Sequence, residues 1–151
     1  MLFSSQRRRI GLAAAVIALI WLGALAGVSF LSTPAKFAVT DLSLPVALQV
    51  GQVTFAAFAR VEWVFALALL AACGWAWRIA PWRLGLAVLI AAGVLARALW
   101  LLPALSGRVA MIVAGESPPS APHHAIYAAI EGVKALALTA LAFLALRALP
   151  P

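Results

Sequence analysis

The chain has 151 residues, of which 66% are hydrophobic and 10% are charged. This composition and a mean hydropathy of +1.10 exclude an ordinary soluble domain, in which about a quarter of the residues are charged, and they equally exclude intrinsic disorder. The net charge is +7, and the single cysteine excludes a disulfide framework and a Cys-x-x-Cys metal or redox motif.

The first apolar run, residues 10–31, contains no charged residue and follows Arg7, Arg8 and Arg9. It is longer than the roughly 7–15 apolar residues of a signal peptide, and Ser32-Thr33-Pro34 is a poor cleavage site. We therefore expect a retained membrane span, since about 20 apolar residues cross a bilayer.

Three further spans follow the first one. The second is expected over 59–77, at the end of a longer helix-compatible stretch that begins at Pro45. The third is expected over 84–102, where Pro103 should kink or end the helix. Residues 104–113 are then candidates for a short interfacial helix. The fourth span is expected over 123–147, after a loop that contains three prolines. The sequence thus predicts an all-α, polytopic membrane protein, a single four-transmembrane-helix bundle over residues 1–151.

The basic residues indicate how the bundle is oriented. Four spans place both termini on one side, together with six arginines: Arg7, Arg8, Arg9, Arg78, Arg83 and Arg147. The opposite side has Lys36 and Arg108, so the positive-inside rule makes both termini cytoplasmic. Basic residues at span ends indicate a lipid bilayer as partner and no nucleic acid. The Ala/Leu/Arg-rich composition suggests a high-GC bacterium and hence its inner (plasma) membrane.

Four charged residues interrupt the apolar runs: Glu62, Arg97, Glu131 and Lys134. Counted from the cytoplasmic arginines at about 1.5 Å per residue, all four lie about 20–24 Å deep, in one layer in the outer third of the membrane. Because isolated charges are costly there, we expect them to face the interior of the bundle and to form the pairs Glu62–Arg97 and Glu131–Lys134. Arg60, further out, can extend to the lipid headgroups.

Helical spacing extends this layer outward. On the fourth span His124, Tyr127, Glu131 and Lys134 share one face, with His123 beside it. On the second span Gln52, Phe55, Ala59 and Glu62 do the same, which predicts a polar funnel that opens to the extracytoplasmic side. The candidate ligand or ion site comprises Arg60, Glu62, Arg97, Tyr127, Glu131 and Lys134.

Three interpretations of this layer remain open. It is a structural salt-bridge network that sets helix pairing, or a site for a ligand, ion or proton, or a metal or haem site with His123 or His124 as ligand. Adjacent histidines point about 100° apart on a helix, and the chain has no His-x-x-x-His or His-Glu-x-x-His motif to support metal ligation. No nucleophile elbow, P-loop or dinucleotide motif is present, so we name no catalytic residue and do not favour an enzyme.

Several segments resemble one family. They are residues 29–37, 44–51, 58–63 and 123–127, followed by Glu131 and Lys134. Together they are similar to the small bacterial four-span proteins with the transmembrane-protein-205-like domain, a domain of unknown function. The resemblance implies a four-helix membrane bundle and supplies no reaction. In size and layout the chain is more distantly similar to copper-resistance-D-type and haem-containing four-span proteins. Their histidines lie within spans, whereas His123 and His124 stand at a span end.

From these features we expect a small membrane-embedded binding or accessory protein. It would act alone, as a homo-oligomer or as a subunit of a larger membrane complex. The alternative is a redox or transport protein that binds haem or copper. The cytoplasmic halves of the spans are unbroken Ala, Leu and Val, so a channel formed by one chain is not expected.

Overall fold

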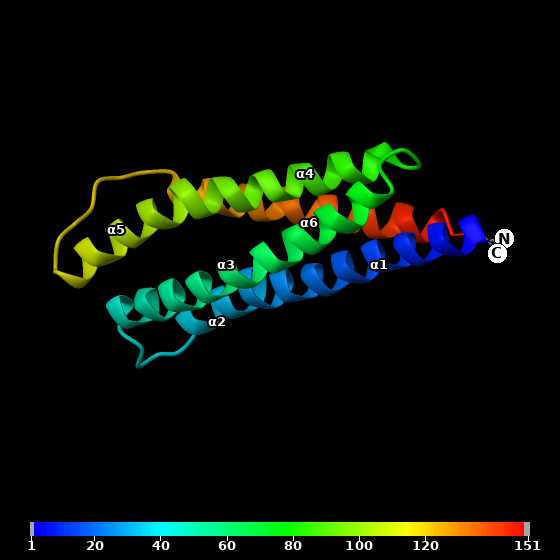
Figure 1. Ribbon diagram of the computed structural model, residues 1–151. Helices are drawn as coiled ribbons and strands as arrows, with labels where there is room; N and C mark the ends of the chain where they lie inside the picture. Colours follow the sequence, from blue (N-terminus) through cyan, green and yellow to red (C-terminus); the bar gives the residue numbers. More distant parts are fainter. Residues whose placement is uncertain (1, 150–151) are drawn as a thin grey trace.

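The computed structural model describes residues 2–149, and this part of the chain is helical and contains no β-strand. Helices and loops alternate so that four long rods run along one axis (Figure 1). The rods are built from these elements: α1 (Leu2–Leu25), η1 (Ala26–Ser32) and α2 (Thr33–Phe37); α3 (Leu44–Trp75); α4 (Pro81–Ala96), η2 (Arg97–Leu101) and α5 (Leu102–Val113); and α6 (His123–Arg147). The predicted all-α four-helix bundle is confirmed.

Four helices in the described part of the chain are long and apolar enough to cross a membrane: Arg8–Phe37, Leu44–Trp75, Pro81–Val113 and His123–Arg147. Their outward surfaces keep large apolar side chains exposed, such as Leu136 with 73% of its surface accessible. A water-soluble bundle would present polar residues there, so the chain is a multi-pass membrane protein.

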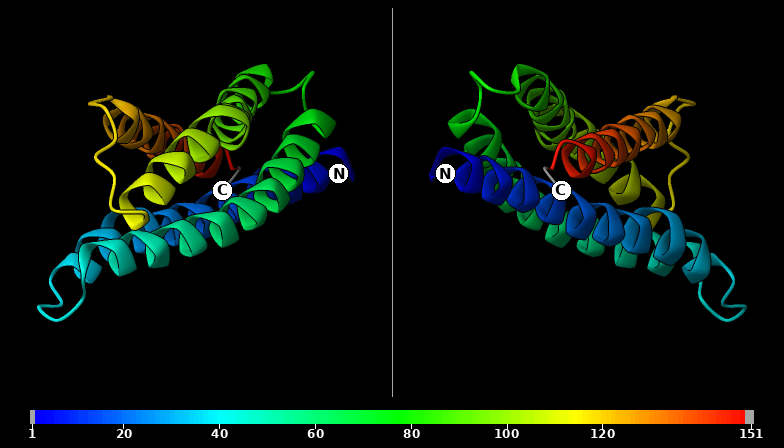
Figure 2. Two further views of the ribbon diagram at one scale, coloured as in Figure 1. Left: turned by 90° about the vertical axis from the view of Figure 1, so that its left-hand side faces the viewer. Right: turned by 90° about the vertical axis from the view of Figure 1, so that its right-hand side faces the viewer.

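The rods pack in a ring. α1 contacts α3 and α6, and α4 contacts the same two helices from the other side. In the two end-on views the α1–α3 pair lies on one side of the bundle and the α4–α6 pair on the other (Figure 2). Both termini and the α3–α4 turn lie at one end, which we call the terminal end, while the other two loops lie at the distal end (Figure 1).

Two of the rods contain a π-helical segment two residues before a proline. η1 ends at Ser32 before Pro34, and η2 ends at Leu101 before Pro103. A proline lacks an N–H, and its ring crowds the carbonyl four residues earlier in an α-helix. The wider π turn relieves this conflict without ending the helix. The helix is therefore distorted before Pro103 but does not end there.

This continuity changes the expected extent of the third rod. Residues 104–113 do not form a separate interfacial helix, because α5 continues the same rod to Val113. Likewise α3 begins at Leu44 and passes through Gly51 as one helix of 32 residues. The rods thus extend further toward the distal end than the predicted spans did.

The core is made largely of alanine and a few larger side chains. Ala14, Ala18, Ala66 and Ala87 are buried where helices meet, and Trp21 lies among them with no exposed surface. Small residues let membrane helices approach closely enough for van der Waals packing. The tight contacts also exclude water from the interior, so the charged residues there must find their partners within the protein.

Candidate functional site

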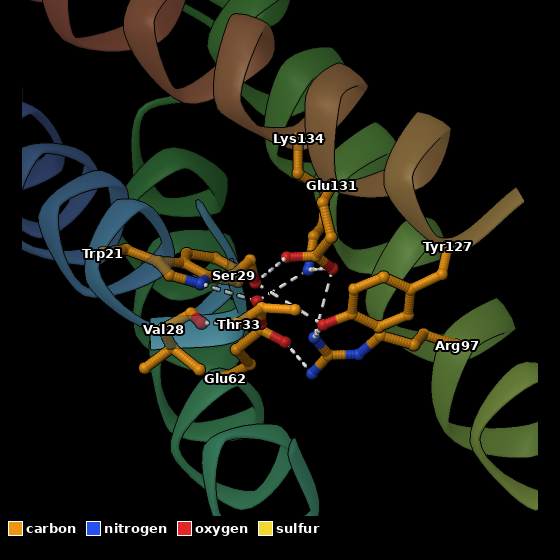
Figure 3. A network of polar contacts seen from close by, with 9 residues as sticks. All are labelled: Trp21, Val28, Ser29, Thr33, Glu62, Arg97, Tyr127, Glu131 and Lys134. Atoms are coloured by element: carbon orange, nitrogen blue, oxygen red, sulfur yellow. Dashed lines mark hydrogen bonds and ion pairs between the residues drawn. The ribbon is translucent and has the colours of Figure 1, made fainter. Parts of the chain in front are cut away.

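Four charged side chains meet inside the bundle, and we call them the ion quartet: Glu62, Arg97, Glu131 and Lys134. Each of them is at most 1% exposed. α3 supplies the first carboxylate, the start of η2 supplies the guanidinium, and α6 supplies the remaining two groups. All four point toward one another (Figure 3).

Each cation of the quartet bridges both carboxylates. Arg97 forms an ion pair with Glu62 through one terminal nitrogen, and its other terminal nitrogen lies 3.1 Å from Oε1 of Glu131. Lys134 Nζ lies 2.6 Å from Glu62 Oε1 and 2.7 Å from Glu131 Oε1. Two positive and two negative groups therefore alternate in a closed ring with zero net formal charge. Such pairing offsets the large cost of removing each charge from water.

The predicted pairs Glu62–Arg97 and Glu131–Lys134 are both present. The structure adds the two cross pairs, Glu62–Lys134 and Glu131–Arg97. Spacing along a single helix predicts only the contact within α6. The cross pairs depend on how the rods are rotated about their axes.

The first rod also contributes to the site, although its span contains no charged residue. Trp21 Nε1 donates a hydrogen bond of 3.0 Å to Glu62, and Ser29 Oγ donates one of 3.1 Å to Glu131. Neither residue was predicted from the sequence. One signal was available: Trp21 lies in the middle of a span, away from the interfaces, where an indole N–H needs a buried partner.

Aromatic rings border the Arg97 guanidinium. Its central carbon lies 5.7 Å from the Phe58 ring centre and 5.9 Å from that of Tyr127. The Tyr127 hydroxyl lies 3.5 Å from the guanidinium and 3.4 Å from the Ser29 hydroxyl. Within the described residues, Arg97 Nε is buried without a hydrogen-bond partner. The guanidinium is thus held on several sides, while its Nε–H remains unpaired.

The two π-helical segments supply side chains to this site. Arg97 is the first residue of η2, and Ser29 lies in η1. Short π segments inside α-helices occur frequently at functional sites. Here each π-helical segment has two roles. It accommodates the following proline, and it contains a residue, Ser29 or Arg97, whose side chain takes part in the site.

The quartet lies near the middle of the rods and not toward one end. Arg97 is at the midpoint of the Pro81–Val113 helix, and Glu62 and Lys134 lie close to the midpoints of theirs. The expected position in the outer third of the membrane was counted from the cytoplasmic arginines, and it stays a prediction. Within the bundle itself the quartet is central, because the third rod continues to Val113.

Three other predicted site residues lie outside the quartet. Arg60 is exposed on the outer surface of α3, two positions from Glu62 and on another face of the helix. His123 is half-buried with its ring edge against Trp100, while His124 is exposed and stacks on Tyr127. Within residues 2–149, no three His, Cys, Asp or Glu side chains are arranged to hold a metal ion.

A hollow of about 130 Å³ lies distal to the quartet, and we call it the outer pocket. It lies between α2, α3 and α5, with His124 of α6 at its edge. Gln52 and His124 line it as the predicted funnel requires, but most of its wall is apolar. Tyr127 and the quartet are sealed beneath, with Tyr127 only 5% exposed, so the predicted open polar funnel is not formed.

Comparison with known proteins identifies no relative of this chain. No family model, no curated protein and no solved structure matches it. The function is therefore inferred from the quartet and the outer pocket.

Proposed function

We propose that the protein is a small membrane-embedded binding or accessory protein of a bacterial inner membrane, with both termini in the cytoplasm. It works alone, as a homo-oligomer or as a subunit of a larger membrane complex. The observation that carries this proposal is the ion quartet, in which four fully paired charges are buried at the centre of four apolar helices. The terminal end, which carries Arg78, Arg83 and Arg147, is the cytoplasmic end by the positive-inside rule.

The cost of the quartet supports a functional role. A charged residue at the centre of a membrane helix costs on the order of 2.5–3.5 kcal/mol on insertion scales, and apolar residues of similar volume hold buried helices together at least as well. Ionisable groups inside a span are therefore functional candidates by default. We assign the quartet the role of fixing the four helices in one register beneath a binding pocket.

The chemistry of the quartet favours binding over catalysis. Each carboxylate accepts from both cations, and Trp21 and Ser29 occupy further positions on them. Neither carboxylate is free to act as a base or nucleophile. The ring has no net charge, so an incoming ion would have to displace an internal pair. We therefore place the ligand in the outer pocket and give the quartet a supporting role.

The test is to identify molecules that co-purify with the protein. Wild-type protein in mild detergent is analysed by native mass spectrometry, beside Leu105→Trp, which fills the outer pocket, and Leu136→Trp, which changes an exposed position on α6. We expect a bound molecule on the wild type and on Leu136→Trp, and its loss from Leu105→Trp. Protein that carries no molecule in all three forms contradicts the binding role.

The same samples also test the metal or haem alternative. Absorption spectra and metal analysis compare the wild type with His123→Ala and His124→Ala. A Soret band or a stoichiometric metal that either substitution removes would replace the proposal with a cofactor-binding function. A colourless, metal-free protein with a bound organic molecule would support it.

A further inference from the structure

Lys36 is a cation without a counter-ion at the distal end of the bundle. It lies in the last turn of α2, half-buried, with Nζ 5.0 Å from the Phe37 ring centre and 5.4 Å from that of Phe55. No carboxylate among residues 2–149 is within ion-pair distance of it. Its ammonium packs against the backbone of α3 at Gly51, where a Cβ atom would collide with it. Glycine at this position therefore makes room for the charge.

Two hollows of different character meet at Lys36. The first is the outer pocket, whose wall includes the apolar side chains of Leu48, Leu102 and Leu105. The second has a volume of about 210 Å³, and its wall combines the hydroxyl groups of Ser32, Thr33 and Thr54 with the apolar side chains of Val50 and Phe55. The Lys36 ammonium thus lies between an apolar hollow and one that also offers hydroxyl groups.

The hydroxyl groups are available mainly as acceptors. Ser32 and Thr33 donate to the carbonyl of Val28, and Thr54 donates to the carbonyl of Val50. Their remaining lone pairs can receive hydrogen bonds from a polar group of a ligand. The Lys36 ammonium supplies the donors and the positive charge that an anionic group requires.

The position of Lys36 along the bundle fits the phosphate layer of a bilayer whose mid-plane we place at the quartet, in the middle of the rods. Gly51 lies about 16 Å from that level along α3, at about 1.5 Å per residue from Glu62. Half of the hydrocarbon thickness is about 15 Å. The ammonium over Gly51 is therefore at the boundary where the acyl chains end and the headgroups begin.

We propose that this site binds an anionic phospholipid from the surrounding bilayer, with its phosphate on Lys36 and one acyl chain in the outer pocket. The inference rests on the proposed binding function and specifies its ligand. The headgroup occupies the hydroxyl-lined hollow, which favours a headgroup with hydroxyl donors of its own, such as glycerol. Basic pockets between membrane helices on the cytoplasmic or matrix side hold lipid headgroups, and the same attraction of a phosphate to a cation operates at the distal end. An apolar wall beside the cation distinguishes a lipid from a free phosphate.

Native mass spectrometry with defined lipids tests the inference. The delipidated full-length protein is titrated in detergent with phosphatidylglycerol, phosphatidylcholine or inorganic phosphate, and the bound fraction is measured. We expect one tightly bound phosphatidylglycerol, weaker phosphatidylcholine and no retained phosphate. Lys36→Gln should weaken phosphatidylglycerol binding about tenfold or more, since a hydrogen bond to a charged group contributes about 1.5–3 kcal/mol. Lys36→Arg should restore most of the affinity.

Two glycine substitutions test whether the position of the Lys36 ammonium matters for lipid binding, independently of its charge. Gly51→Ala displaces the Lys36 ammonium and keeps the net charge, so phosphatidylglycerol binding should weaken severalfold. Gly107→Ala on α5, where an added Cβ meets nothing within 4 Å, should have no effect. Arg108→Gln removes another distal cation and should also leave binding unchanged. Circular dichroism of each variant checks that the bundle is intact.

Several results would overturn the inference. These are equal binding of the two lipids, unchanged binding in Lys36→Gln, and an equal loss in Arg108→Gln, which would indicate unspecific charge attraction. If Leu105→Trp expels a co-purified molecule that is not an anionic phospholipid, the proposed binding function stands and this inference fails. If the wild type carries no molecule and binds no added phosphatidylglycerol, both fail.

Discussion

Lys134 Nζ lies 2.6 Å from Oε1 of Glu62, although the two residues are 72 positions apart in the chain. Their helices, α3 and α6, lie across the bundle from each other, since both pack mainly against α1 and α4. This contact therefore joins two helices that pack little against each other directly. Together with the Arg97 pairs it connects three rods at one level. The charges in the interior are therefore balanced only when these three rods are assembled.

Loss of one carboxylate should destabilise the protein strongly. Glu62→Gln leaves Arg97 and Lys134 with one carboxylate between them, and an uncompensated buried charge costs about 3–5 kcal/mol. The free energy of unfolding, measured by chemical denaturation in detergent, should fall by about this amount. Arg60→Gln is the matched control on the exposed face of α3 and should change it by less than about 0.5 kcal/mol. Equal effects of the two substitutions would contradict the central role of the quartet.

Removal of one charge of each sign should be less harmful than the single changes suggest. In Glu62→Gln/Lys134→Gln the remaining pair, Arg97 and Glu131, is neutral. A double-mutant cycle on unfolding free energies should therefore give a favourable coupling of about 0.5–3 kcal/mol, as found for residues in one network. Strict additivity would show that Lys134 and Glu62 act independently, against the observed contact.

Trp21 should stabilise the bundle through its indole N–H. Trp21→Phe retains an aromatic ring beside Phe65, whose centre lies 5.6 Å away, but removes the donor to Glu62. We expect a loss of about 1.5–3 kcal/mol in unfolding free energy, because this hydrogen bond has a charged acceptor. Trp75→Phe, at a position that is 76% exposed, is the control and should change the stability little. If Trp21→Phe were neutral, the hydrogen bond would have no energetic weight.

Gly93 should be required for the close approach of α4 to α6. A Cβ at this position would lie 3.2 Å from Cγ and 3.3 Å from Cδ of Lys134, so Gly93→Ala forces the lysine chain, which is held by its ion pairs, to shift by a few tenths of an ångström. We expect a loss of about 1–3 kcal/mol, the range for overpacking in a core. Gly132→Ala on α6 meets nothing within 4 Å and should be neutral or stabilising, since alanine favours a helix over glycine by about 0.5–1 kcal/mol. Thermal denaturation of the two variants in the same detergent distinguishes these outcomes.

The proposed orientation predicts which loops face outward. Ser117→Cys lies in the α5–α6 loop at the distal end, and Ile79→Cys lies in the α3–α4 turn at the terminal end. A membrane-impermeant maleimide should label only Ser117→Cys in intact cells. Both cysteines should react after the cells are opened. The native Cys73 is 1% exposed and should remain unlabelled in wild-type protein. Labelling of Ile79→Cys alone in intact cells would reverse the orientation.

The sequence by itself determined the class of protein and all four members of the quartet. Four apolar runs of sufficient length require four membrane helices, because a backbone in lipid must satisfy its own hydrogen bonds. A charge within such a run is easily recognised, and its cost implies a partner. The constant rise of a helix then places Glu62, Arg97, Glu131 and Lys134 at one level, and these residues do meet.

Only the tertiary structure decided how these groups connect. Periodicity shows which residues share a helix face but not how each helix is rotated toward its neighbours. The sequence therefore could not predict the Lys134–Glu62 contact. The participation of Ser29 and the central position of Arg97 depend on π-helical turns that carry the rods past Pro34 and Pro103. A local pattern predicts that a proline disturbs a helix, but the packing of the neighbouring helices decides whether the helix ends or continues.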